Sequence, residues 1–281
     1  MTLSQAFATY CRLEITLKGG ADKTRRNYQT AINSFSAVIG DLPVQLITLE
    51  HVQAWVDYMQ SLGHQPSSVK SSLSHMRCVF KFLRKQQFRV IDYRDIELPK
   101  VPKKKHEVLD YSEVQSMIDA ATNLRDKAIV ACLFSTGCRI SELLNLNRGD
   151  IQNGEATVLG KGSKLRPVFF DKTALEALES YLDTRHDNIP ALFISGQYRR
   201  ITVCRVEQIL HVLAAEAGIE KNVTPHVFRH STITDYIQNG APMGIVQRMA
   251  GHASIKTTLD IYTHVSDDTL RDVAKRYHTK S

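Results

Sequence analysis

The feature that most constrains the fold of this 281-residue chain is a short basic stretch, Pro99-Lys100-Val101-Pro102-Lys103-Lys104-Lys105-His106. Proline cannot donate a backbone hydrogen bond inside a helix, and it disfavours helical geometry at the residue before it. Two prolines and four lysines so close together therefore predict an extended linker. We place this linker at residues 99–107, where it separates a domain at 1–98 from a second domain at 108–281.

The positive charge of the chain is concentrated in the first domain and the linker. Residues 1–98 carry 12 Lys and Arg against 8 Asp and Glu, residues 99–107 carry 4 against 1, and residues 108–281 carry 20 against 20. This distribution suits a polyanionic partner without identifying it. Lys103 and Lys104 could belong to a solvated spacer or lie along phosphate groups, and composition leaves both alternatives open.

Targeting signals and cysteine motifs are not evident in the sequence. The chain has no run of about eighteen apolar residues, and its N-terminus lacks a basic region followed by an apolar one. We therefore expect a cytoplasmic protein without a membrane span. The cysteines form no C-x-x-C pair and are expected to be reduced thiols: Cys11, Cys78, Cys132, Cys138 and Cys204.

The N-terminal domain is predicted to be a small four-helix unit. Ser4 is the expected cap of a helix to about Leu17, which Gly19-Gly20 would end. The other helices are expected from Asp22 or Thr24 to about Val38, from Thr48 to the stop at Gly63, and from Pro66 to about Gln87.

The fourth predicted helix has two distinct faces. Its apolar residues recur at intervals of four and three, which places them on one core-facing side: Val69, Leu73, Met76, Phe80 and Leu83. The other side is basic, and the helix contains no Asp or Glu. A basic solvent-facing helix is common in any protein, but a single sign of charge favours contact with DNA phosphates. The candidate DNA-binding residues are Lys70, Arg77, Lys81 and Arg84 here, and Lys23, Arg25 and Arg26 in a second cluster.

Residues 108–281 predict further helices and one small hairpin. Helices are expected at Ser112–Ala121, from Asn123 to the stop at Gly137, and at Ser141–Leu146, Thr173–Arg185, Thr202–Ala217 and from Thr224-Pro225 onward. Strands are expected at Ala156–Leu159 and Leu165–Phe169, with a further candidate at Ala191–Ile194. The fold class is therefore mainly α with a small β-sheet.

The turn of the hairpin, Gly160-Lys161-Gly162-Ser163-Lys164, superficially resembles a nucleotide-binding loop. Such a loop needs Ser or Thr after the lysine and a helix that begins there. Here Gly162 follows Lys161 and a strand is predicted next, so we predict no ATP site. No other cofactor is expected.

The chemistry of phosphate binding and attack is concentrated between His226 and Tyr262. Arg229 can hold two phosphate oxygens in a fork, His226 and His252 can donate further hydrogen bonds, and the hydroxyl of Tyr262 can attack phosphorus. Elsewhere, Arg139 lies at a predicted helix junction, where the carboxylate of Glu142 can orient its guanidinium.

A zinc site is the alternative interpretation of His226 and His230, which are four positions apart on a predicted helix. That motif requires Glu directly after the first histidine, where this chain has Val227. The remaining histidines offer no spacing typical of a third ligand. We therefore predict no metal.

An ordered set of motifs resembles the tyrosine recombinase (phage integrase) family: Thr136-Gly137-Cys138-Arg139-Ile140-Ser141-Glu142-Leu143, Gly160-Lys161-Gly162, His226-Val227-Phe228-Arg229-His230, Gly251-His252 and Tyr262. The resemblance covers about residues 108–281, and the N-terminal helices resemble the SAM-like core-binding domain of the family. It implies a site-specific DNA recombinase that uses neither metal nor ATP. Tyr262 would form a 3′-phosphotyrosine and Lys161 would protonate the leaving 5′ oxygen. The phosphate would be held by Arg139, His226, Arg229 and His252, with Glu142 and His230 in support.

The same resemblance implies double-stranded DNA as the partner and a protein that is mainly monomeric in free solution. A homotetramer would form on two duplexes, linked by a predicted helix at Ser266–Tyr277, and an accessory directionality protein is compatible with this assembly. The spacing of ten from His252 to Tyr262 is similar to that of many mobile-element integrases, whereas the short N-terminal region resembles simple resolvases. Integration or excision of an element and resolution of replicon dimers therefore both stay open.

Two other functions compete with recombination. A type IB topoisomerase-like enzyme would nick and close DNA as a monomer, whereas the small core-binding domain and the short C-terminal helix favour a recombinase. A DNA-binding module with an inactive site would lack some catalytic residue types, whereas all of them are present in this sequence.

Overall fold

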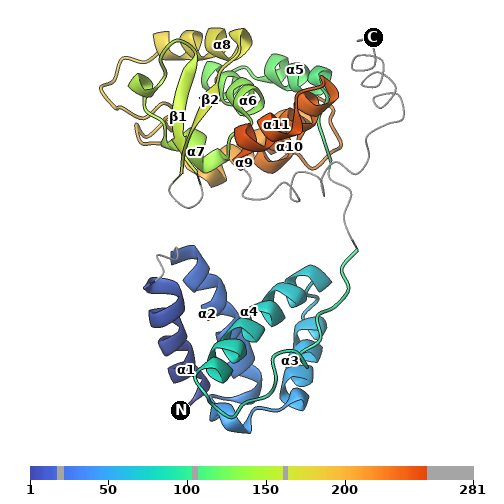
Figure 1. Cartoon of the computed structure of the whole chain (residues 1–281). Coiled ribbons are helices and arrows are strands. Elements are labelled where there is room, and N and C mark those ends of the chain that lie inside the picture. The colour runs from blue at the N-terminus through green and yellow to red at the C-terminus, as the bar shows by residue number, and fades with distance from the viewer. Residues whose placement is uncertain (18–21, 103–106, 161–163, 252–281) are drawn as a thin grey trace, which may run out of the picture. The chain divides into compact units, whose positions relative to one another are not determined.

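The computed structural model describes residues 1–17, 22–102, 107–160 and 164–251. The chain forms two compact units, residues 1–104 and 105–281, and each is described by itself (Figure 1). The fold is mainly helical with a small two-stranded sheet, as predicted.

The described regular elements of the first unit are all helical. Its elements are α1 (Leu3–Tyr10), a π-helical continuation (Cys11–Thr16), α2 (Asp22–Ile39), a 3-10 turn (Val44–Leu46), α3 (Leu49–Ser61) and α4 (Pro66–Lys85). The predicted cap of the first helix was wrong by two residues. Thr2 is the cap, because its side chain accepts from the backbone N–H of Gln5, while the N–H of Ser4 donates to Asp41 at 2.8 Å.

The core of the first unit is built around Trp55. Its ring packs edge-to-face against Phe35 at 5.1 Å, and its indole N–H donates to the hydroxyl of Ser34 at 2.9 Å. The predicted apolar face of α4 is buried in full, which confirms the spacing argument. After α4 the chain packs back onto this core, where Ile96 is 1% exposed.

The second unit combines helices with the predicted hairpin. Its elements are α5 (Tyr111–Ala120), α6 (Leu124–Thr136), α7 (Ile140–Asn145), a 3-10 turn (Arg148–Asp150), β1 (Glu155–Leu159), β2 (Leu165–Phe169), α8 (Lys172–Asp183), α9 (Val203–Glu216), α10 (Pro225–Gln238) and α11 (Met243–Ala250). Asp110 caps α5 in place of the predicted Ser112, whose hydroxyl donates to that carboxylate at 2.6 Å. The predicted cap of α6, Asn123, is confirmed.

Helix α6 lies at the centre of the second unit. Every residue from Ala128 to Leu133 is buried, and α5, α8 and α10 all contact this helix. Strands β1 and β2 are antiparallel, with Thr157 opposite Pro167, and alternate residues of each strand face the core. The further strand predicted at Ala191–Ile194 was wrong, because the described backbone there forms only isolated bridges to Asn147 and Arg200.

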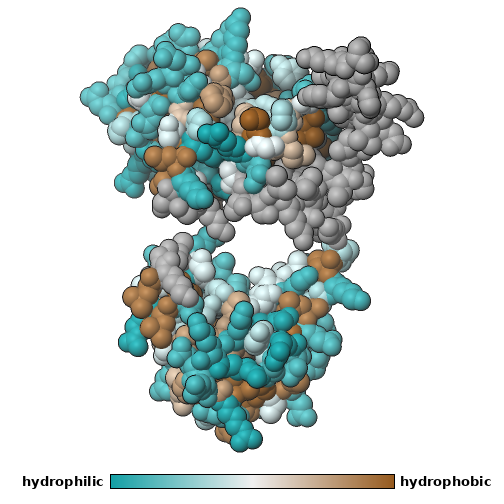
Figure 2. Space-filling model, in the orientation of Figure 1, coloured by the Kyte–Doolittle hydropathy of each residue, from teal (hydrophilic) through white to brown (hydrophobic). Residues whose placement is uncertain are grey.

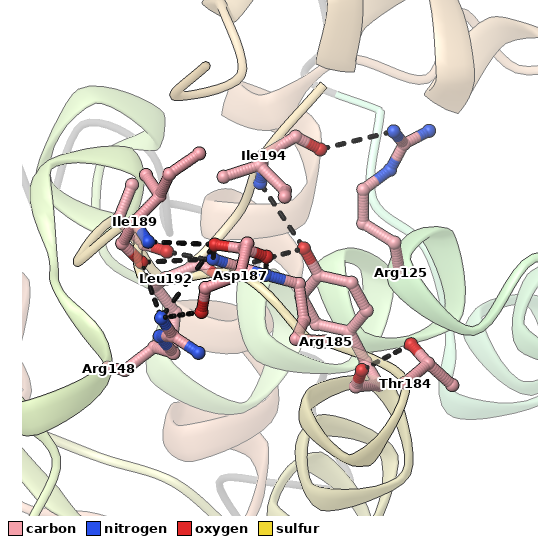
Figure 3. Close-up of polar contacts among 10 residues, drawn as sticks. Arg125, Arg148, Thr184, Arg185, Asp187, Ile189, Leu192 and Ile194 are labelled. Carbon is pink, nitrogen blue, oxygen red and sulfur yellow. Dashed lines mark hydrogen bonds and ion pairs between the residues drawn. The ribbon is translucent and has the colours of Figure 1, made fainter. Parts of the chain in front are cut away.

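A buried arginine holds the long connection between α8 and α9 in place (Figure 3). The guanidinium of Arg185 donates to both carboxylate oxygens of Asp187, at 2.5 and 2.7 Å. It also donates to the carbonyl oxygens of Ile189, Ala191 and Leu192. Buried carbonyl groups need such partners, so these bonds replace regular secondary structure in this loop.

The visible surfaces of both units are predominantly hydrophilic, and apolar residues form small separate patches (Figure 2). Two exposed leucines, Leu159 and Leu165, pair across the end of the hairpin. Among the described helices, none is both long enough and apolar enough to cross a membrane.

Candidate active site

Arg139 is positioned by the junction between α6 and α7. Helix α6 ends at Gly137, whose φ of +53° is favourable for glycine, and α7 begins directly after Arg139. The carboxylate of Glu142 fixes Arg139 at this junction. It accepts hydrogen bonds from the backbone N–H and from Nη1 of Arg139, each at 2.8 Å. The Arg139 side chain is 30% exposed, so it remains accessible to a ligand.

The carboxylate of Glu142 is the buried anion of the site. Its side chain is 4% exposed, and it also accepts from Nη2 of Arg166 at 2.7 Å. Burial raises the pKa of Glu142, but the hydrogen bonds from Arg139 and the charges of Arg166 and Arg139 outweigh burial and hold this pKa below its ordinary value. Glu142 therefore stays ionised at neutral pH.

Arg229 lies on α10, whose first turn is formed by the Thr224 cap and Pro225, as predicted. Its side chain is buried, and Nη1 donates to the carbonyl oxygen of Gly137 at 2.8 Å. Nη2 donates to the carbonyl oxygen of Ala250. Burial lowers the pKa of Arg229 to about 10, helped by the positive charges of Arg139 and Arg166, so it is still charged at neutral pH.

The end of α11 brings the two predicted arginines together. Helix α11 ends at Gly251 with a φ of +60°. Nη2 of Arg139 lies 3.5 Å from the carbonyl oxygen of Gly251, and Arg229 donates to the carbonyl of the preceding residue. Arg139 and Arg229, which are 90 positions apart in the sequence, thus direct their guanidinium groups at the carbonyl oxygens of two consecutive residues.

The two histidines of α10 differ in exposure. His226 is exposed and His230 is half-buried, with 6.4 Å between the ring centroids. Within the described parts of the chain, no three His, Cys, Asp or Glu side chains are grouped closely enough to hold a metal ion. Three predicted catalytic residues, Lys161, His252 and Tyr262, lie outside the described residues.

Arg166 belongs to the arginine cluster but lies in none of the motifs that indicated the site. It follows the alternation of β2, which turns Arg166 and Val168 to the buried side while Leu165 and Pro167 face outward. An arginine at an inward position of a short strand needs a buried acidic partner, so this alternation was the available signal.

The charges of the cluster favour an anionic ligand. Arg139 and Arg166 are ion-paired with the carboxylate of Glu142, and the charge of Arg229 interacts with the same carboxylate. Cys138 adds no negative charge, because burial raises the pKa of its thiol to about 11. Positioned guanidinium groups are suited to phosphate, whose oxygens match their fork of N–H donors.

The basic face of α4 is only partly free of contacts within the protein. Arg84 is ion-paired with Asp92 at 2.6 Å, because the chain after α4 brings this carboxylate back to the helix. Arg77 and Lys81 lie 6.0 and 5.8 Å from the ring centre of Tyr93, while Lys70 is half-buried.

The second predicted cluster, on α2, is exposed to solvent: Lys23, Arg25 and Arg26. Arg25 lies 3.9 Å from Asp22, a long and exposed contact that leaves its charge available. The linker residues Lys103 and Lys104 lie outside the described residues.

A separate concavity of about 630 Å³ lies in the second unit beside the connection between α8 and α9. Its two arginines are already paired within the protein, Arg125 with Asp126 at 2.8 Å and Arg185 with Asp187. We therefore interpret it as a structural feature and place the candidate site at the arginine cluster.

Known families match both units. The phage integrase family model matches residues 107–269, and the model of the phage integrase N-terminal SAM-like domain matches residues 12–87. The tyrosine recombinase XerD of Oceanobacillus iheyensis is 32% identical, over 98% of this chain and 97% of that protein. The tyrosine recombinase XerC of Alcanivorax borkumensis is 30% identical, over 92% of this chain and 88% of that protein.

Solved structures of a recombinase and an integrase are also similar to this chain. The crystal structure of XerA recombinase has 27% identity and a TM-score of 0.55, and the match covers 99% of this chain and 98% of that one. The Tn1549 transposon integrase in complex with transposon right end DNA has a TM-score of 0.81 at 18% identity, with 99% and 100% covered. This second similarity supports the fold alone.

Proposed function

Since this chain belongs to the phage integrase family and is a tyrosine site-specific recombinase that breaks and rejoins DNA, we propose that Arg139, Arg229 and His226 hold the scissile phosphate while Tyr262 attacks it. The observation that carries this proposal is the convergence of Arg139 and Arg229 at the end of α11, directly before His252.

The arginines supply what the reaction needs most. A phosphodiester repels nucleophiles, and negative charge grows on its oxygens as phosphorus becomes five-coordinate. Preorganised cations stabilise that charge, and removing one such donor typically slows a reaction about 10²–10³-fold. Arg139 is fixed by Glu142, and Arg229 by the carbonyl of Gly137, so both are oriented before DNA binds.

The covalent step conserves the phosphodiester. The hydroxyl of Tyr262 releases its proton to solvent and bonds to phosphorus, the bond from phosphorus to the 5′ oxygen breaks, and Lys161 donates a proton to that oxygen. His226 and His252 donate hydrogen bonds to the phosphate. Attack by another 5′ hydroxyl on the 3′-phosphotyrosine reseals the strand and frees Tyr262. Because each step exchanges one phosphoester for another, no ATP is consumed. The arginines and histidines supply the charge stabilisation that metal ions supply in many nucleases.

We further propose that DNA binding uses Lys70, Arg77 and Lys81 of α4, Lys23, Arg25 and Arg26 of α2, and the linker residues Lys103 and Lys104. The working assembly is a tetramer on two duplexes. A type IB topoisomerase-like activity would instead relax a supercoiled plasmid with a single protomer on one duplex, so the number of duplexes in the active complex separates the two functions.

The first prediction tests the nucleophile. A duplex is first selected from a random-sequence pool by covalent attachment to the parent protein. Tyr262→Phe should bind this selected duplex with parental affinity, since only one hydroxyl is lost, and should form no covalent adduct on a denaturing gel. Tyr198→Phe, at an exposed tyrosine far along the sequence from the site, is the matched control and should form the adduct. An adduct of equal yield in Tyr262→Phe would exclude this residue as the nucleophile.

A further inference from the structure

Arg166 is a buried arginine whose hydrogen-bonding capacity is only partly used. Its side chain is 9% exposed, and Nη2 donates to Oε2 of Glu142. Nε and Nη1 are enclosed, with no hydrogen-bond partner among the residues that the structure describes. Burying a guanidinium costs free energy even when it is paired, so a contribution to packing alone does not explain this residue.

Glu142 divides its two oxygens between the side chains of two arginines. Oε1 accepts from Nη1 of Arg139 at 2.8 Å, and Oε2 accepts from Nη2 of Arg166 at 2.7 Å and from the backbone N–H of Arg139 at 2.8 Å. An unshared arginine and carboxylate commonly pair through both oxygens in a fork. Because Nη2 of Arg166 and the backbone N–H of Arg139 already occupy Oε2, the Arg139 side chain bonds only Oε1, and its Nη2 is directed towards the carbonyl oxygen of Gly251.

The net charge around Arg139 also depends on the pairing of Glu142 with Arg166. Without Arg166, the full negative charge of Glu142 would act on Arg139, its nearest remaining partner. Opposite charges in contact attract strongly where water is excluded. Arg139 would then be drawn into a fork with Glu142, and its charge would be partly neutralised before phosphate binds.

We propose that Arg166 is a positioning residue for strand cleavage, which holds one oxygen of Glu142 so that Arg139 stays oriented and charged for the scissile phosphate. This inference rests on the proposed function, specifically on the role of Arg139. Arg166 does not itself contact the DNA, because its free donors are enclosed beside Gly251, where an added Cβ would lie 2.8 Å from Nε.

The test uses the full-length protein and the selected duplex, with the rate of covalent adduct formation as the readout. Arg166→Met removes the charge and keeps the length of the side chain. Loss of a residue that orients a metal ligand typically reduces activity about 10–100-fold, and we expect a loss of similar size here. The rate at saturating duplex should fall, while the half-saturating duplex concentration should not change. Arg166→Lys should recover part of the rate, because it keeps a charge beside Glu142.

The decisive variant combines Arg166→Met with Glu142→Gln. If Arg166 acts by balancing Glu142, the double variant should cleave faster than Arg166→Met, because the unbalanced carboxylate has been removed. Arg125→Met is the matched control, since Arg125 is also a part-buried arginine in an ion pair, and it should cleave at the parental rate.

Three results would overturn the proposal. They are parental cleavage by folded Arg166→Met, no gain in the double variant over Arg166→Met, and an increase in the half-saturating duplex concentration that accounts for the whole loss. If circular dichroism shows that Arg166→Met does not fold, the rate of adduct formation by Glu142→Gln is compared with that of the double variant. A double variant much slower than Glu142→Gln would then overturn the proposal. A parent protein that forms no adduct with any duplex contradicts the proposed function instead.

Discussion

At the scale of single residues, the two arginines proposed to bind the scissile phosphate differ in their contacts with the rest of the protein. Arg139 is part-exposed, whereas Arg229 is buried and satisfies the carbonyl oxygens of Gly137 and Ala250. An enclosed carbonyl left without a donor destabilises a protein by about 1–3 kcal/mol. The same substitution at the two positions should therefore affect stability differently.

We predict that Arg139→Ala and Arg229→Ala each slow adduct formation by at least about 10²-fold, the usual effect of losing one transition-state donor. Thermal unfolding should show Arg229→Ala destabilised by at least about 1–3 kcal/mol through its carbonyl partners. Arg139→Ala should be destabilised through a different group, the buried carboxylate of Glu142, which keeps Arg166 as its remaining side-chain partner. EDTA should leave the parent active. A requirement for added magnesium or zinc in cleavage would contradict the metal-free mechanism.

At the scale of secondary-structure elements, the end of α6 determines where Arg139 and Arg229 lie. Gly137 combines a φ of +53° with a close neighbour, because an added Cβ would lie 3.0 Å from Cγ2 of Thr232. Its carbonyl oxygen also accepts from Arg229. A side chain at this position would thus disturb the turn that orients both arginines.

Gly137→Ala should destabilise the protein by about 1–2 kcal/mol, the usual effect of a left-handed backbone conformation on a residue with a Cβ, and should also slow adduct formation. Denaturant unfolding of the full chain measures the first effect. Gly149→Ala is the matched control, since Gly149 does not have a positive φ and has open space around it. Equal stability of the two variants would mean that the Gly137 turn relaxes without strain.

The basic face of α4 provides a test of DNA binding within one helix. Each phosphate contact on B-DNA contributes a slope of about −0.9 to the dependence of log affinity on log salt concentration. Lys81→Ala should therefore reduce the magnitude of the slope by about 0.9, and Lys70→Ala and Arg77→Ala should do the same. Arg84→Ala should change the slope less, because the guanidinium of Arg84 is already ion-paired with Asp92. An unchanged slope in all four variants would place the DNA surface elsewhere.

The sequence was sufficient to predict most of these elements and insufficient for contacts between them. The spacing of Val69, Leu73 and Met76 determined the buried face of α4, because periodicity is a local property. The pairing of Arg84 with Asp92 could not be predicted, since it depends on the path of the chain after the helix ends. Arg166 was missed for a similar reason: its partner Glu142 lies on another element, 24 positions earlier.

At the scale of the whole molecule, assembly on DNA is the remaining question, and the predicted helix at Ser266–Tyr277 lies outside the described residues. Its sequence has few apolar residues, chiefly Leu270, Val273 and Ala274. Such a narrow stripe buries little area on its own domain but can occupy a groove of a neighbouring subunit. A head-to-tail exchange of this kind forms a closed ring when the rotation between subunits closes.

We predict that removing residues 267–281 leaves binding to a single duplex nearly intact, because the candidate DNA-binding residues all lie earlier in the chain. The truncated protein should fail to form the complex of four protomers on two duplexes, and recombination should stop. Analytical ultracentrifugation with the selected duplex measures both states, and the parent without DNA should sediment mainly as a monomer. Removing only residues 278–281, beyond the predicted helix, is the matched control and should preserve the tetramer. Four truncated protomers on two duplexes would show that another surface connects the subunits.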